Sequence, residues 1–179
     1  KNNGYFVVSA HREENVDLND NFETLAASLN MVAEKYQKPI IFSTHPRTKN
    51  RIEKNKTKFH ALIKNIPPLG FFDYVSLQKN AYVVLSDSGT ISEESAMMGF
   101  PAVSIRTSTE RPEAIDAGTV VLGGIGTNEV LNAIEITKGL SVNEHSDLPW
   151  EYNVKNTSER VVKVIQSYTP IVDKVIWNK

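Results

Sequence analysis

The sequence contains no cysteine among its 179 residues. This absence excludes a disulfide framework and any thiolate metal site, and it fits a reducing compartment, so we expect a cytoplasmic protein. The charges nearly cancel, with a formal net charge of −1, which argues against a nucleic-acid partner or an acidic tail. No apolar run approaches the ~20 residues of a membrane span and no signal peptide is visible, so we expect no membrane partner.

The composition is that of a globular protein with a proper core. Hydrophobic residues make up 40% of the chain and charged residues 23%. Because no repeat or low-complexity segment divides the sequence, we expect a single domain over residues 1–179. The chain begins with Lys1 rather than Met, just ahead of an apolar run, and we expect it to be part of a longer polypeptide.

Short apolar runs alternate with segments of helical periodicity. We expect strands at Tyr5–Ser9, Pro39–Phe42, Leu62–Ile66, Tyr82–Leu85, Ala102–Ile105 and Thr119–Leu122. We expect helices after the N-caps Asp20 and Thr127, over 49–58 and 71–77, up to Met98, and after Asn156 until Pro170 breaks the last one. A final apolar stripe covers 170–178, after an irregular stretch at 140–152. This alternation predicts an α/β fold with a doubly wound parallel sheet.

The stretch from Ala81 to Ser104 predicts a strand, a tight turn, a helix and a second strand. Its turn contains Gly89, which permits close approach of the backbone to a bound group. The first turn of the helix has unpaired N–H groups and partial positive charge, and Ser88 and Thr90 add hydroxyl groups, which together suit a phosphate. Glu94 lies about one helical turn further and suits the hydroxyl pair of a ribose. The stretch therefore indicates a nucleoside diphosphate site.

Two alternatives remain for this stretch. Glu93 could take the ribose in place of Glu94. Thr90 and Glu93 also have the spacing of a capping box, which would make the helix a purely structural one.

Ionisable side chains also follow three other predicted strands. His11 and Arg12 follow the first strand, His45 follows the second, and Arg111 lies in the loop after the fifth. The carboxyl ends of parallel strands form the binding edge of an open sheet, and an arginine there can grip a diphosphate. The alternative is a set of surface ion pairs, with Arg12 on Glu13 or Glu14 and Arg111 on Glu110 or Glu113.

Three motifs in this order resemble one family. They are Val8-Ser9-Ala10-His11-Arg12-Glu13-Glu14-Asn15, Asp87-Ser88-Gly89-Thr90-Ile91-Ser92-Glu93-Glu94 and Thr109-Glu110-Arg111-Pro112-Glu113-Ala114. The sequence resembles, over essentially its whole length, the C-terminal domain of the non-hydrolysing UDP-N-acetylglucosamine 2-epimerases. That family has the two-domain glycosyltransferase-B fold, so the resemblance implies a Rossmann-like C-terminal domain.

The resemblance implies a role for each matching residue. His11 matches the active-site histidine. Arg12 and His45 are expected to contact the substrate because of their positions at strand ends. Ser88, Gly89 and Thr90 match the segment that holds the UDP phosphates. Glu94 matches the ribose glutamate, Arg111 matches an arginine of the nucleotide-sugar site, and Tyr74 falls where the family has an aromatic residue near the base.

The resemblance also implies a reaction and its partners. UDP is expelled by elimination across C1–C2 and adds back with the opposite configuration at C2, without a metal or cofactor. The carboxylates that handle the C2 proton lie in an N-terminal domain absent from this chain, so the chain alone should be inactive. The last helix, expected over 170–178, would pack on that domain, and the family is commonly dimeric.

Two departures from the family pattern point to a subgroup. Thr90 replaces the second glycine of Asp-Ser-Gly-Gly, and Lys155-Asn156-Thr157-Ser158 replaces a late Gly-Asp-Gly. These features resemble enzymes that epimerise other UDP-2-acetamido sugars in capsule or cell-surface polysaccharide synthesis. The competing interpretations are the donor-binding domain of a UDP-sugar glycosyltransferase, which shares Glu94, Gly99 and Pro101, and a non-enzymatic domain that senses nucleotide sugars.

Overall fold

The computed structural model describes residues 3–109, 111–139 and 148–179. They fall into two compact units, residues 1–149 and 150–179. Glu110, one of the expected partners of Arg111, lies outside the described residues, as does 140–147, most of the stretch expected to be irregular.

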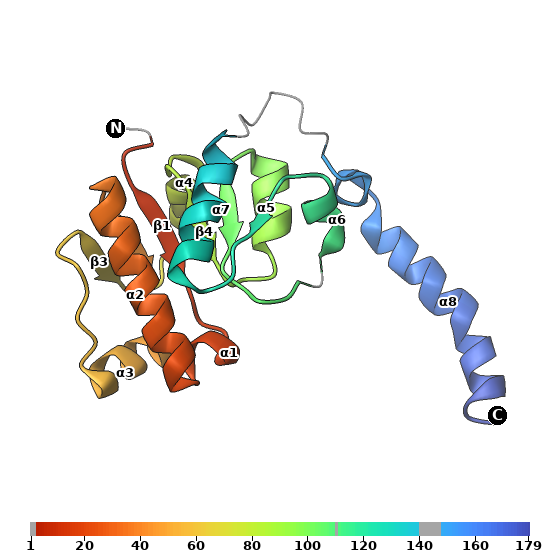
Figure 1. The fold of residues 1–179 in the computed structure, drawn as a ribbon. Coiled ribbons are helices and arrows are strands. Elements are labelled where there is room, and N and C mark those ends of the chain that lie inside the picture. The colour runs from red at the N-terminus through yellow and green to blue at the C-terminus, as the bar shows by residue number, and fades with distance from the viewer. Residues whose placement is uncertain (1–2, 110, 140–147) are drawn as a thin grey trace. The chain divides into compact units, whose positions relative to one another are not determined.

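The first unit contains a parallel six-stranded sheet in the order β3-β2-β1-β4-β5-β6 (Figure 1). The strands are β1 (Phe6–Ser9), β2 (Ile40–Ser43), β3 (Ile63–Ile66), β4 (Val84–Ser86), β5 (Ala102–Ser104) and β6 (Val121–Leu122). The helices of this unit are α1 (Glu13–Val16), α2 (Asn19–Tyr36), α3 (Pro46–Asn55), α4 (Phe71–Lys79), α5 (Ile91–Met98), α6 (Pro112–Asp116) and α7 (Thr127–Gly139). The prediction of a doubly wound α/β sheet is confirmed, and this strand order is that of the Rossmann fold.

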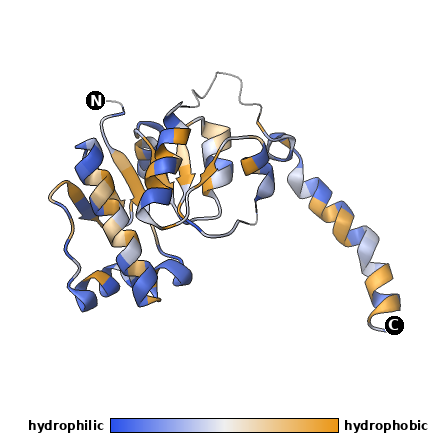
Figure 2. Cartoon of the chain, viewed as in Figure 1, coloured by the Kyte–Doolittle hydropathy of each residue, from blue (hydrophilic) through white to orange (hydrophobic). Residues whose placement is uncertain are grey.

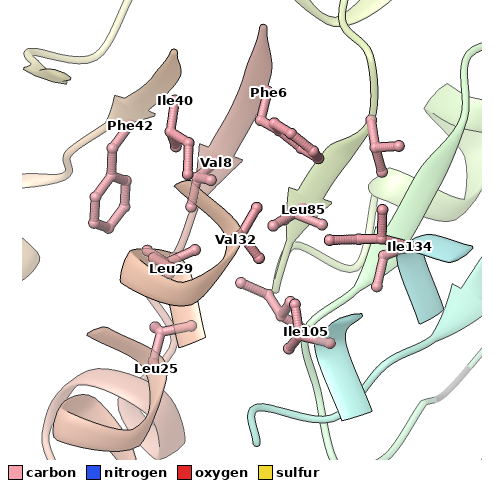
Figure 3. Close-up of a cluster of buried hydrophobic side chains, with 14 of the residues drawn as sticks. Phe6, Val8, Leu25, Leu29, Val32, Ile40, Phe42, Leu85, Ile105 and Ile134 are labelled. Atoms are coloured by element: carbon pink, nitrogen blue, oxygen red, sulfur yellow. The ribbon is translucent and has the colours of Figure 1, made fainter. Parts of the chain in front are cut away.

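Alternate side chains of the central strands fill two different cores. On β1, Phe6 and Val8 enter the larger core, whereas Val7 enters the smaller one. Figure 3 shows the larger core, in which strand residues such as Phe6 and Leu85 meet the apolar faces of α2 and α7. The smaller core contains Ile91 of α5 and lies on the other face of the sheet. Because both faces are covered, the central strands β1, β4 and β5 are apolar up to the serine that ends each of them.

The strand order reverses between β1 and β4. In the sheet, β1 pairs with both β2 and β4, and Ser9 at the end of β1 is in register with Ser86 at the end of β4. The next strands along the chain lie on opposite sides of this pair. Their carboxyl ends therefore lie at a topological switch point, and the crevice at such a point is where ligands bind in open α/β sheets.

The structure corrects three expectations about helix ends. Leu18, not Asp20, is the N-cap of α2, and Asp20 instead lies in the first turn, where its charge favours the helix dipole. Thr90 is the N-cap of α5 but makes no side-chain cap hydrogen bond, so the capping-box alternative is wrong. Pro170 does not end a helix, because α8 (Thr157–Val175) continues through it. A proline inside a helix removes one backbone donor, which the other hydrogen bonds of a long helix can outweigh.

The second unit consists of a short 3-10 helix at Trp150–Asn153 followed by α8. The segment expected as a separate helix over 170–178 is mostly the last part of α8. Apolar side chains recur along α8 at helical spacing, and Figure 2 shows them as hydrophobic bands on its ribbon. Val161, Ile165, Tyr168 and Val172 are among its exposed hydrophobic residues. Within the described residues, no helix is both long enough and apolar enough to cross a membrane.

Candidate functional site

The carboxylate of Asp87 is fully buried at the end of β4 and holds the loop that follows β1. It accepts hydrogen bonds from the backbone N–H groups of His11 (3.0 and 3.1 Å) and Arg12 (2.9 Å). Asn15 Nδ2 donates a third hydrogen bond (3.1 Å) and also reaches the carbonyl oxygen of Ile105 (3.0 Å). A buried carboxylate needs such partners, since desolvation without them is costly. The loops after β1 and β4 are thereby joined across the crevice.

Asp87 also orients the ring of His11. Nδ1 of His11 lies 3.3 Å from Oδ1 of Asp87, and the His11 side chain keeps 42% of its surface exposed. A carboxylate at Nδ1 favours the proton on that nitrogen, which leaves Nε2 to face solvent or a ligand. The arrangement suits a histidine that exchanges or donates a proton at the open side of the crevice.

The side chain of Arg12 runs along the turn after β4. Its Nε donates to the carbonyl oxygen of Asp87 (3.0 Å), and a Cβ placed on Gly89 would lie 3.5 Å from Arg12 Nη2. The Arg12 guanidinium thus lies beside the glycine that precedes α5. Of the two acidic residues that directly follow Arg12 in the sequence, Glu13 pairs with Arg47 (3.0 Å) and Glu14 lies 3.7 Å from Arg106.

A chain of polar contacts leads from this turn into α5. The N–H of Ser88 donates to Ser86 Oγ (3.1 Å), and Ser88 Oγ lies 3.0 Å from Thr90 Oγ1. Thr90 Oγ1 donates to Glu94 Oε1 (2.8 Å), and Gln78 Nε2 donates to Glu94 Oε2 (2.7 Å). The helix N-terminus, the hydroxyl groups and the half-buried carboxylate therefore form one continuous polar strip.

Tyr74 of α4 approaches the same strip. The pKa of Tyr74 is raised to about 12, chiefly by burial and also by the negative charges of Glu94 and Asp87, while a hydrogen bond with Ser9 acts to lower it. These influences place the phenol near the ends of β1 and β4 and near Glu94. At neutral pH the phenol is protonated and can donate a hydrogen bond.

His45 and Arg111 lie at the edges of this region. His45 is the N-cap of α3, where its Nδ1 accepts from the N–H of Arg47 (3.3 Å), and its ring centroid is 5.9 Å from that of His11. Arg111 Nε donates to Glu93 Oε1 (2.8 Å) in the first turn of α5. This pair ties the loop before α6 to α5 and gives Glu93 a different role from that of a ribose ligand.

Asp87, Asn15 and Gln78 were not singled out as site residues from the sequence, and Glu93 was expected only as an alternative ribose ligand. Asp87 carries a signal, an acidic residue directly after an apolar strand, but its partners are 72–76 positions away. Asn15 and Glu93 lie inside recognised motifs without any spacing that indicates their contacts. No sequence pattern points to Gln78, because a polar residue on the apolar side of a helix does not by itself indicate which side chain it contacts. Among the described residues, no group of three or more His, Asp or Glu could hold a metal ion.

The arrangement suits an anionic ligand that also carries hydroxyl groups. The first turn of α5 offers backbone donors, Arg12 lies alongside, and His11 faces the opening. Glu94 supplies an acceptor for hydroxyl groups about one helical turn away.

Comparison with known proteins gives a family match over nearly the whole chain. The family model described as UDP-N-acetylglucosamine 2-epimerase matches residues 1–166. A UDP-N-acetylglucosamine 2-epimerase of Methanococcus maripaludis is 36% identical over 169 residues, which are 92% of this chain and 45% of that protein.

Solved structures agree with this match. The UDP-N-acetylglucosamine 2-epimerase of Rickettsia bellii superposes with a TM-score of 0.80 at 36% identity, covering 100% of this chain and 48% of that one. The Methanocaldococcus jannaschii UDP-GlcNAc 2-epimerase, solved in complex with UDP-GlcNAc and UDP, superposes with a TM-score of 0.78 at 33% identity, covering 91% and 45%. The chain therefore spans about half the length of the relatives it matches.

Proposed function

Because the chain belongs to the UDP-N-acetylglucosamine 2-epimerase family, we propose that its polar strip binds the UDP part of a UDP-2-acetamido sugar. One observation carries the proposal. Buried Asp87 brings the His11–Arg12 loop against the Ser88–Gly89 turn at the switch point of the sheet, with Glu94 one helical turn beyond. A diphosphate at the turn and a ribose at the carboxylate fit that spacing.

In this proposal each side chain has a defined task. The turn of Ser88, Gly89 and Thr90 and the first N–H groups of α5 bind the diphosphate, which Arg12 and Arg111 also neutralise. Glu94 accepts hydrogen bonds from the ribose hydroxyl groups. Tyr74 lies toward the base, His45 borders the sugar side, and His11 is the catalytic residue.

The reaction proposed for the complete enzyme is epimerisation at C2. Elimination breaks the C2–H bond and the C1–O bond, forms a C1=C2 double bond and releases UDP. UDP then adds back to C1 while C2 receives a proton on the opposite face. Charge develops on the departing diphosphate, so the fixed N–H groups at Gly89 and in the first turn of α5 and the charge of Arg12 stabilise the transition state. His11, oriented by Asp87, faces that leaving group.

The groups that move the C2 proton are proposed to lie in an N-terminal half of the same polypeptide. This chain spans 45–48% of the relatives' length, so we expect it to bind UDP weakly and to catalyse no epimerisation by itself. The apolar stripe of α8 supports the same proposal, since an amphipathic helix buries its apolar face against another element. We also propose a homodimeric, cytoplasmic enzyme.

A role in capsule or cell-surface polysaccharide precursor synthesis is the finer proposal. It has support from a second relative, a UDP-2,3-diacetamido-2,3-dideoxy-D-glucuronate 2-epimerase of Pseudomonas aeruginosa, which is 26% identical over 162 residues. That protein is named for a different UDP-2-acetamido sugar. The sugar is therefore best identified by assaying several such substrates.

Titration calorimetry with UDP tests the nucleotide site directly. Glu94→Ala and Arg111→Ala should each weaken binding by more than about tenfold, because each removes a charged hydrogen-bond partner. Lys64→Ala, an exposed change on the edge strand β3, is the matched control and should bind UDP like the unmodified chain. Equal affinity in all four proteins would contradict the site.

The complete polypeptide tests the reaction. Incorporation of solvent deuterium at C2 of the UDP-sugar supports epimerisation. Transfer of the sugar to an acceptor without that exchange would favour a glycosyltransferase, and binding without either would favour a sensing domain.

A heptosyltransferase of E. coli solved with ADP shares the fold at a TM-score of 0.55 and 18% identity, which shows the fold alone.

A further inference from the structure

The carboxylate of Glu94 is held at both oxygens by side chains from different parts of the chain. Thr90, four residues earlier, donates to Oε1 at 2.8 Å, and Gln78 of α4 donates to Oε2 at 2.7 Å. A carboxylate has about four acceptor positions, so these two hydrogen bonds leave about two for a ligand. Two free positions on a fixed carboxylate match the two adjacent hydroxyl groups of a ribose.

The directions of these hydrogen bonds follow from proton counting. A carboxylate only accepts, so the single hydroxyl proton of Thr90 points to Glu94. The 3.0 Å contact between Ser88 Oγ and Thr90 Oγ1 then has Ser88 as its donor. The chain Ser88→Thr90→Glu94 is therefore oriented from the phosphate turn to the carboxylate, which fixes the Glu94 side chain relative to that turn.

Gln78 is unusual because it is buried without full compensation. Only 1% of its surface is exposed, and among the described residues its Oε1 has no hydrogen-bond partner. A buried polar atom without a partner is unfavourable, so an apolar side chain of similar shape would suit a purely structural position better. The single polar contact that explains a glutamine here is the one from Nε2 to Glu94.

We propose that Gln78 and Thr90 are positioning residues that fix Glu94 for recognition of the ribose, and so set the preference for a ribonucleotide over a deoxyribonucleotide. This inference rests on the proposed UDP site, in which Glu94 takes the ribose hydroxyl groups. Without the two donors, Glu94 has free rotamers, and ordering it on binding costs free energy. Removal of these donors should therefore weaken the contact with the ribose and leave the backbone contacts with the phosphates in place.

The test compares the affinities of this chain for UDP and for 2′-deoxy-UDP by calorimetry. Gln78→Met keeps the shape of the side chain but removes the donor, and Thr90→Val does the same at the exposed position. Thr90→Ser keeps the hydroxyl group and is the matched conservative control. We expect Gln78→Met and Thr90→Val to reduce the ratio of the two affinities several-fold, and Thr90→Ser to preserve it.

The ratio separates positioning from a structural role. Thr90→Val also releases the Ser88 hydroxyl, but that change acts on both diphosphates alike and cancels in the ratio. Equal weakening of UDP and 2′-deoxy-UDP, or an unchanged ratio in both variants, would overturn the inference. Circular dichroism checks the fold of Gln78→Met, and the exposed Thr90 pair gives the answer independently if that variant unfolds.

Glu94→Ala distinguishes failure of this inference from failure of the proposed site. If the unmodified chain prefers UDP and Glu94→Ala abolishes the preference, the ribose site stands and the Gln78 and Thr90 variants decide the inference. If Glu94→Ala retains the preference of the unmodified chain, the ribose assignment itself is wrong, and the positioning role falls with it.

Discussion

The buried carboxylate of Asp87 lies 3.3 Å from Nδ1 of His11, 76 positions earlier in the sequence. The same carboxylate accepts the backbone N–H groups of His11 and Arg12, so it fixes both the ring and the loop that carries it. A single side chain at the end of β4 thus decides the geometry of the loop after β1.

Because several groups donate hydrogen bonds to Asp87, we predict that substitution of this residue lowers the stability of the protein. Asp87→Asn places an amide N–H₂ against groups that are themselves donors, and several partly buried donors lose an acceptor. We expect the free energy of unfolding to fall by about 3 kcal/mol, since each lost charged hydrogen bond is worth about 1.5–3 kcal/mol. Urea denaturation measures the change, with Asp116→Asn at the exposed end of α6 as the control. A free energy of unfolding equal to that of the control would contradict the proposed role of Asp87 in holding the loop after β1.

Gly89 and Gly99 should separate binding from stability. A Cβ on Gly89 meets only the end of Arg12 at 3.5 Å, so Gly89→Ala should leave the unfolding free energy unchanged while weakening UDP binding about tenfold or more. Gly99 has a φ of +68° with open space around its Cβ position. Gly99→Ala should therefore cost about 1 kcal/mol of stability and leave binding intact. The opposite pattern in the two variants would show that the phosphate lies elsewhere.

The raised pKa of Tyr74 predicts how the free energy of unfolding depends on pH in the alkaline range. Burial raises the pKa of Tyr74 to about 12, whereas an unfolded tyrosine titrates near 10. The unfolded chain therefore loses this proton first, so the stabilising contribution is complete below about pH 10 and is lost as the pH rises to about 12. The two-unit difference corresponds to about 2–3 kcal/mol.

Comparison with Tyr74→Phe isolates that contribution. Burial also raises the pKa of Tyr5 and Tyr36, so the unmodified chain loses stability from several groups. The Phe variant should lose less stability than the unmodified chain between pH 10 and 12, measured by urea denaturation at each pH. If the free energies of unfolding of the two proteins changed in parallel between pH 10 and 12, the raised pKa of Tyr74 would be contradicted.

The proline at position 170 is expected to lower the stability of helix α8. Proline at this position removes a backbone donor from a helix that continues to Val175. Pro170→Ala should make α8 unfold at a higher temperature, followed by circular dichroism at 222 nm, and leave the signal of the folded chain nearly unchanged, because alanine is about 3 kcal/mol more favourable than proline in a helix interior. Thr157→Ala, at the first position of α8, is the control and should give a smaller change. A clearly stronger signal for folded Pro170→Ala would mean that the helix ends before residue 170 in solution.

The class of fold and the position of the candidate site could both be predicted from the sequence alone. Apolar runs with helical segments between them require a parallel sheet covered on both faces, and the polar residues that follow each strand mark its carboxyl edge. These features are local, because the periodicity of a strand or helix depends only on neighbouring positions. The turn before α5, with Ser88 and Gly89 followed by Glu94, could be read in the same way. The motifs around it also identified the family.

The contacts between these side chains could not be predicted from the sequence and are defined by the folded structure. Asp87 with His11, Arg111 with Glu93 and Gln78 with Glu94 are pairs separated by 16–76 positions, and each depends on how strands and helices are ordered in the sheet. The continuation of α8 through Pro170 likewise reflects a balance between one lost hydrogen bond and the rest of a long helix. Patterns along a chain report the environment of each residue, whereas contacts report the arrangement of whole elements, and that arrangement is settled only when the elements pack.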